Sequence, residues 1–197
     1  MRASVRICAI LLAMPLAAAD RMTVSVCTRG RLDEKAVTGA EETAAALFRA
    51  VDIEVVWATC ETGLEGDAAV QQHWFTVRLR DGEPFIRPGP GTRDTLGEAF
   101  LSLDNDGYIA DVYHQAVESL CASKQLDLDR VLGYVIAHEL GHLLLGPGHA
   151  AQGVMRAEWD LRDLQAISQH RLQFSSAEGL RMRRVLDVSP GSDSTAP

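Results

Sequence analysis

The distribution of apolar and polar residues along the first half of the chain predicts β-strands. Some segments alternate between apolar and polar residues, and others are short apolar or β-branched runs bounded by turn-forming residues, as is typical of strands. The predicted strands are residues 22–28, 53–59, 73–80, 97–103 and 108–114. Between the last two, Asp104-Asn105-Asp106-Gly107 favours a tight hairpin turn. A calcium loop is the alternative there, although the full calcium-binding pattern is absent.

A helix is predicted between the first two strands. Residues 33–51 are rich in Ala, Glu and Leu, and Asp33 is suited to cap the helix. A strand, a helix and a strand in succession indicate a parallel pair joined by a right-handed crossover. The chain therefore predicts an α+β fold, an α/β-like sandwich built on a twisted mixed sheet of about five strands.

The second half of the chain is mainly helical. A helix is expected from Gln115 onward, and Asp127 or Asp129 can cap the next one, which is strongly apolar. A C-terminal helix is expected over 159–171, continuing to about residue 186.

The first 19 residues have the pattern of a signal peptide. Arg2 and Arg6 precede an apolar stretch, residues 7–16, and Ala17-Ala18-Ala19 supplies the small residues that a signal peptidase requires. The apolar stretch is too short for a permanent membrane anchor. We expect cleavage after Ala19, a secreted or periplasmic protein without a membrane anchor, one domain over 20–188, and a disordered tail over 189–197.

Composition and charge narrow the range of partners. Apolar residues make up 47% of the chain and charged residues 23%, which is ordinary for a globular protein. Removing the two arginines of the signal peptide leaves 17 basic against 27 acidic residues, a formal charge of −10. This balance disfavours nucleic acid and anionic membranes as partners. We expect a monomer that acts on a peptide or protein substrate.

Three cysteines remain after cleavage: Cys27, Cys60 and Cys121. In an oxidising compartment, an odd number predicts one disulfide and one free thiol. Cys27 and Cys60 each lie in or at the end of a predicted strand, which favours that pair. No C-x-x-C spacing supports a cysteine metal site.

The segment HELGHLLLGPGH, residues 138–149, carries the strongest chemical information. His138 and His142 stand four positions apart on a predicted helix, so both imidazoles face the same side. Glu139 lies beside that face, close to where a metal-bound water would be. The alternative is a helix whose histidines are only surface or core residues. The strongly apolar helix argues against it, because polar residues there need a reason to be buried.

These residues resemble the metzincin clan of zinc endopeptidases, which includes matrix metalloproteinases and astacins. Metzincins carry H-E-x-x-H-x-x-G-x-x-H, followed by a turn that holds a methionine. The matching residues, in order and type, are His138, Glu139, His142, Gly146 and His149, and Gly153-Val154-Met155 is similar to the methionine turn. The resemblance extends over residues 22–171 and is specific over 138–155.

The chain departs from the metzincin pattern at one point. Three leucines, instead of two residues, separate His142 from Gly146, so His149 comes one position late. One extra helical residue adds about 1.5 Å and rotates the helix end by about 100°. The turn Gly146-Pro147-Gly148 is flexible enough to absorb this change. The alternative third ligand is Glu158, which would make a His-His-Glu site similar to that of thermolysin.

The resemblance implies one catalytic Zn²⁺ ion held by three histidines, with Glu139 as the general base of peptide-bond hydrolysis. It also implies that strand 97–103 is a sheet edge that pairs with an extended substrate; a purely structural strand is the alternative. Trp159 is expected either to line the pocket beyond the scissile bond or to belong to the core. Met155 is expected to support the site by packing.

Two other functions are alternatives to a secreted zinc endopeptidase. A bacterial family of zinc endoribonucleases uses three histidines at similar spacing, but it lacks the glutamate after the first histidine. Glu139, the signal peptide and the acidic charge argue against that function. A catalytically inactive zinc-binding module of the same fold is the other alternative, which an intact Glu139 disfavours.

Overall fold

The structure is a computed structural model, and it describes residues 20–29, 32–60, 73–82 and 95–187. The predicted signal peptide and the predicted tail, residues 189–197, lie outside the described residues. All of the predicted strands and helices lie within the described part.

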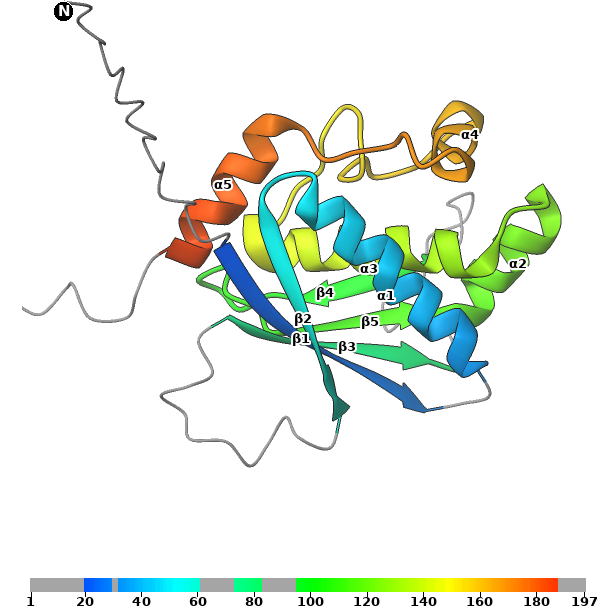
Figure 1. Cartoon of the computed structure of the whole chain (residues 1–197), viewed down its shortest axis with the longest axis horizontal. Helices are drawn as coiled ribbons and strands as arrows, with labels where there is room; N and C mark the ends of the chain where they lie inside the picture. The colour runs from blue at the N-terminus through cyan, green and yellow to red at the C-terminus, as the bar shows by residue number, and fades with distance from the viewer. Residues whose placement is uncertain (1–19, 30–31, 61–72, 83–94, 188–197) are drawn as a thin grey trace, which may run out of the picture.

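Five strands form one mixed sheet in the order β2-β1-β3-β5-β4 (Figure 1). The strands are β1 (Asp20–Arg29), β2 (Ile53–Thr59), β3 (Trp74–Arg80), β4 (Gly97–Phe100) and β5 (Ile109–Tyr113). β1 pairs in parallel with β2 and β3, and β3 pairs in parallel with β5. β4 alone runs antiparallel, against β5, and forms one edge of the sheet. The expected parallel first pair and the mixed five-stranded sheet are confirmed.

The described helices pack against this sheet or against one another (Figure 1). They are α1 (Glu34–Arg49), α2 (His114–Lys124), α3 (Leu128–Leu145), α4 (Leu161–Ser168) and α5 (Ser176–Asp187). α1 and α3 cover the sheet, while α4 and α5 pack against α3. None of the described helices has the length and apolar composition needed to cross a membrane.

Helix α3 is the centre of the molecule. Every residue from Val131 to Leu144 is buried, whereas a helix at a protein surface usually buries only one stripe. α3 also lies unusually close to α1, and Gly133 permits this approach because a Cβ atom there would lie 2.6 Å from the carbonyl oxygen of Ala40. The helix that carries the histidines is thus fixed on all sides by packing.

The core between sheet and helices follows from strand alternation. In β3 the side chains of Phe75, Val77 and Leu79 are buried, and the residues between them are only partly buried. In β1, Met22 and Val24 are buried on the same face. The period of two that predicted these strands therefore also decides which face receives the helices.

The predicted ends of several elements are corrected by the structure. β4 ends at Phe100 instead of residue 103, because the hydroxyl of Ser102 accepts hydrogen bonds from the backbone N–H groups of Asp104 and Asp106 and the turn starts early. α3 begins after its N-cap residue Asp127, which is one of the two predicted caps. The antiparallel pairing of β4 with β5 confirms the hairpin that encloses residues 104–107.

A helix is present within the predicted range 159–171, but it covers only Leu161–Ser168, and its expected continuation to about residue 186 is wrong. Asp160 caps α4 through a reciprocal capping box with Asp163, so Trp159 lies outside the helix. α4 ends two residues before His170, whose φ of 54° is incompatible with a continuing helix. The chain then crosses to α5 in a non-helical segment that buries Leu172 and Phe174.

Cys27 and Cys60 form a disulfide, as predicted, and join the ends of β1 and β2. Cys121 is a buried free thiol. Burial raises the pKa of Cys121 to about 11, and the nearby carboxylates, with Asp127 the strongest, add to this effect. The thiol is therefore unreactive at neutral pH.

We expect the Cys27→Ser/Cys60→Ser double variant to lose about 3–4 kcal/mol in free energy of unfolding, because the disulfide closes a long loop in the unfolded chain; the two cysteines are 33 residues apart. Denaturant titration measures this loss. A reducing agent should destabilise the parent protein to the same extent and leave the double variant unchanged. A parent protein that is insensitive to reduction would show that the two cysteines are not paired.

Candidate metal and catalytic site

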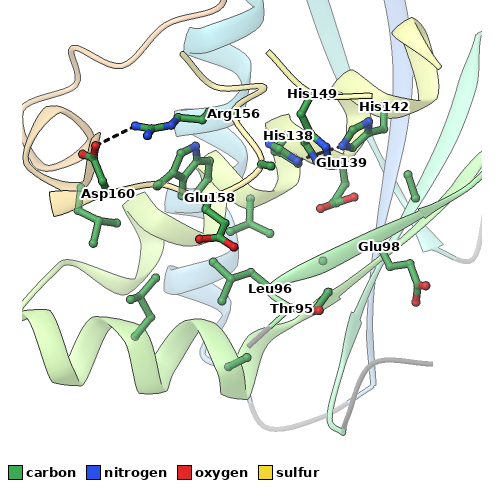
Figure 2. A pocket seen from close by; sticks show the side chains of 18 of the residues that line it. Thr95, Leu96, Glu98, His138, Glu139, His142, His149, Arg156, Glu158 and Asp160 are labelled. Atoms are coloured by element: carbon green, nitrogen blue, oxygen red, sulfur yellow. Dashed lines mark hydrogen bonds and ion pairs between the residues drawn. The ribbon is translucent and has the colours of Figure 1, made fainter. Parts of the chain in front are cut away.

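Three histidines converge at the C-terminal half of α3 (Figure 2). His138 and His142 come from adjacent turns of the helix, and their Nε2 atoms are 3.1 Å apart. The ring of His149 lies 5.5 Å from that of His138 and 4.8 Å from that of His142, measured between centroids. One nitrogen from each of the three residues lies within 4.8 Å of the others. The structure therefore brings together the three histidines selected from the sequence.

Backbone carbonyls orient two of these rings. The Nδ1 atom of His138 lies 2.7 Å from the carbonyl oxygen of Val154, and that of His142 lies 3.3 Å from the carbonyl oxygen of Gly146. A carbonyl only accepts, so each Nδ1 carries the proton and each Nε2 presents a lone pair. Two lone pairs that face one another at 3.1 Å repel unless a cation lies between them.

This arrangement fits a zinc ion. Two nitrogens bound to tetrahedral zinc at about 2.0–2.1 Å are separated by about 3.3 Å, close to the observed Nε2 separation. Hydrogen bonding of the remote ring nitrogen to a carbonyl is also the usual support of a histidine ligand. His138, His142 and His149 are thus the residues that could hold the metal.

Burial keeps the two helical histidines neutral. His138 is 9% exposed and His142 8% exposed. Burial lowers the pKa of His138 to about 4, and the hydrogen bond that His138 donates to the Val154 carbonyl opposes that shift only in part. Burial also lowers the pKa of His142, against the opposing effect of the Gly146 carbonyl. Neutral imidazole is the form that binds metal ions.

The turn after α3 absorbs the extra residue of the motif. The helix continues through all three leucines to Leu145, and Gly146 leaves it with φ 81° and ψ −170°. Gly148 also has a positive φ, 114°, so two of the three residues in the turn adopt conformations that other side chains disfavour. With this geometry the chain folds back and places His149 beside the helical pair. Glu158, the alternative third ligand, does not belong to this group of possible metal ligands among the described residues.

Two residues, Met155 and Trp159, pack around the helix and the turn that position the histidines. Met155 packs against Gly141 so closely that a Cβ atom there would overlap the methionine sulfur. The indole of Trp159 donates a hydrogen bond to the Val154 carbonyl at 3.3 Å, the same oxygen that orients His138. Its ring also meets the His138 ring edge-on, with 5.9 Å between centroids. Trp159 therefore supports the site. It lines the cavity and is also packed, partly buried, against the core, the two roles that the sequence left as alternatives.

Glu139 points from the helix toward the edge strand, beside the histidines (Figure 2). It is 5% exposed. Gly97 of β4 provides the space for its carboxylate, because a Cβ atom at residue 97 would lie 2.6 Å from Oε1 of Glu139. Burial raises the pKa of Glu139 to about 8, and the negative charge of Glu98 adds to the shift. A metal cation nearby acts in the opposite direction. Such a carboxyl can both accept and return a proton near neutral pH.

A cavity of about 1240 Å³ opens beside this group of side chains. One wall is formed by β4 and the residue before it, Leu96, and the opposite wall by the segment that follows Met155. α2 closes the cavity with Ala116 and Leu120, and α3 contributes Val135. Apolar side chains thus contribute much of the lining of the cavity that also contains the histidines, as in binding sites for apolar groups.

The sequence did not reveal three residues of this site. The sequence pattern indicates Gly97 only as the start of a strand, although a glycine within a strand often marks a close approach of another group. The carbonyl of Val154 orients His138, and no side-chain pattern marks a backbone acceptor. Glu98 influences the pKa of Glu139 across 41 positions of sequence, a proximity that depends on how β4 lies against α3.

Comparisons with known proteins establish the fold. No protein-family model matches the chain, and no curated protein matches it. The structure is similar to that of archaemetzincin from Methanopyrus kandleri, with a TM-score of 0.53 and 17% sequence identity over 88% of this chain and 99% of that chain. It also resembles metalloproteinase-II from Bacteroides fragilis, with a TM-score of 0.49 and 16% identity over 85% of this chain and 53% of that chain. The chain thus has an α+β fold of the kind seen in archaemetzincin.

We expect the parent protein to bind one zinc ion per chain and the His149→Ala variant to lose it, because the structure places His149 with the helical pair. Elemental analysis after dialysis against trace zinc measures the ratio. The matched control is Glu158→Gln, which should retain the parent ratio. Loss of zinc in the control alone would instead make Glu158 the third ligand.

Proposed function

We propose that the protein is a zinc-dependent endopeptidase of the metzincin type. The observation that carries the proposal is the joint placement of three converging histidines and a buried glutamate at the mouth of a largely apolar cavity. The motif 138–149, the methionine packed beneath the helix and the archaemetzincin-like fold support the assignment to the clan. One Zn²⁺ ion would be bound by His138, His142 and His149.

When bound, zinc supplies a Lewis acid that polarises a carbonyl and brings the pKa of a water molecule toward neutrality. Glu139 takes a proton from the attacking water while the water oxygen bonds to the carbonyl carbon of the peptide. Glu139 then passes that proton to the amide nitrogen as the C–N bond breaks. The products are a new carboxyl group and a new amine, and Glu139 returns to its initial state.

The chain's own residues can also orient the substrate. β4 is an edge strand, so an extended peptide can add to it through backbone hydrogen bonds. The side chain that then points toward α3 enters the cavity formed by Leu96, Leu120 and Val135. We therefore place a large apolar residue next to the scissile bond.

The proposal includes action outside the cytoplasm, on peptide or protein substrates and as a monomer. The Cys27–Cys60 disulfide supports this setting, since such bonds persist in oxidising compartments. The pattern of residues 1–19 supports export.

We expect the Glu139→Gln variant to lose at least about 100-fold in kcat/KM on a peptide substrate, because the amide cannot accept the proton. It should bind zinc with the same stoichiometry as the parent protein. Cleavage of a diverse peptide pool, analysed by mass spectrometry with and without a chelator, measures the effect. Equal cleavage by both proteins would exclude Glu139 as the base.

If neither protein cleaves any peptide while both hold one zinc per chain, the catalytic proposal fails. An inactive zinc-binding module of the same fold then becomes the better description. Cleavage of RNA by the parent protein, lost with the chelator, would instead favour the endoribonuclease.

We expect the Gly97→Ala variant to retain zinc and lose about 10- to 100-fold in kcat with little change in KM. The added methyl group displaces the Glu139 carboxylate, and misplacing a catalytic group by about 1 Å can cost that much. Steady-state kinetics on a peptide identified with the parent protein measure both constants.

A double variant separates this effect from general damage. Glu139→Asp shortens the carboxylate side chain by one methylene, so it should cost less activity in the Gly97→Ala background than in the parent background. Strictly additive losses would show that residue 97 does not act through Glu139.

A further inference from the structure

We infer that Glu98 selects substrates with a lysine or arginine directly next to the residue that fills the apolar cavity. This inference rests on the proposed endopeptidase function and adds a substrate class to it. It follows from the alternation of backbone and side-chain directions along β4.

The backbone of β4 uses alternate residues to bond to β5. The carbonyl of Leu96 accepts from the N–H of Tyr113, and the N–H of Ser102 donates to the carbonyl of Asp106 within the same hairpin. Because backbone directions alternate along an antiparallel strand, Glu98 and Phe100 also direct their backbone groups toward β5. Gly97 and Ala99 therefore direct theirs toward the open edge, where a peptide can pair.

Side chains of the same strand alternate between the two faces of the sheet. Gly97 lies on the face that meets Glu139 and α3, so Glu98 lies on the opposite face. Figure 2 shows its carboxylate directed away from the three histidines. Tyr113, which is on the same outer face of β5, donates a hydrogen bond from its hydroxyl to Glu98 Oε2 at 3.0 Å.

The arginines nearest to Glu98 pair with another carboxylate. The two arginines of β3 that lie nearby, Arg78 and Arg80, both pair with Asp111, at 2.5 and 3.6 Å. No ion pair involves Glu98 among the described residues, and Arg78 also stacks over the ring of Phe100 at 5.5 Å. Within the described part of the chain, the outer face of β4 thus presents the Glu98 carboxylate, hydrogen-bonded but without a cation.

A peptide paired antiparallel with the open edge of β4 would place a side chain beside Glu98. The residue opposite Glu98 falls between those bonded to Gly97 and Ala99, at a non-hydrogen-bonded position where cross-strand side chains come closest. Its neighbours in the peptide face α3, and one of them fills the apolar cavity. A cation at the position beside Glu98 is attracted, and an anion is repelled.

Two sets of three peptides test the inference, one set for each of the two positions that flank the cavity-filling residue, with Lys, norleucine or Glu at that position. The quantity to compare is the ratio of kcat/KM for Lys and norleucine within each enzyme. This ratio cancels any effect of residue 98 on Glu139, whose pKa it influences. The enzymes are the parent protein, Glu98→Gln and Glu98→Lys, and Glu54→Lys is the matched control, a strand residue at the opposite edge of the sheet.

At one flanking position the parent protein should favour Lys by about two- to fivefold, the range of exposed ion pairs, and disfavour Glu. High salt should reduce this preference. Glu98→Gln should remove it, Glu98→Lys should reverse it toward Glu, and Glu54→Lys should keep it. Cleavage with the same ratios in the parent protein and Glu98→Lys would overturn the inference and leave the proposed function intact. If neither the parent protein nor any of the variants cleaves a peptide, the proposed function is overturned instead.

Discussion

The burial of α3 on all sides is the constraint on which the rest of the structure depends. A helix enclosed by the sheet, α1 and the C-terminal segment can hold polar side chains only if each has a partner, because an unpaired buried polar group costs about 2–7 kcal/mol. Two carbonyls of the following turn, at Gly146 and Val154, provide partners for His138 and His142. The same bonds leave the Nε2 lone pairs facing one another. The packing that stabilises the helix thus also creates the demand for a cation.

In the segment after α3, the backbone of one residue, Val154, forms hydrogen bonds with several parts of the site. The carbonyl of Val154 accepts from both His138 and Trp159, while the N–H of the same residue donates to the carbonyl of Gln173. The backbone that orients a histidine is therefore itself tied to the chain that leads into α5. The break between α4 and α5 allows this hydrogen bond, because a continuous helix from Trp159 could not bring Gln173 back to Val154.

β3 could be predicted from the sequence because its apolar positions follow a period of two, and α3 because a long apolar run carries two histidines at i and i+4. The motif also identified the three histidines and Glu139, since i and i+4 on a helix fix a common face. What could not be predicted depends on contacts across the sequence. The break at His170 follows from a left-handed residue and from the burial of Leu172 and Phe174. The space that Gly97 leaves for Glu139 exists only after β4 has paired with β5 and come against α3.

β4 contacts several parts of the site, because its two edges and its two faces meet different groups. Toward β5 it is bonded through alternate residues, and at its other edge no described strand pairs with it. Toward α3 it carries Gly97, whose missing side chain admits the Glu139 carboxylate. Toward the outer face it carries Glu98, held by the Tyr113 hydroxyl. The strand has only four residues, so a peptide paired with it would meet the buried carboxylate and the outer one at adjacent positions. Chemistry and charge selection would then be set by neighbouring residues of one short edge strand.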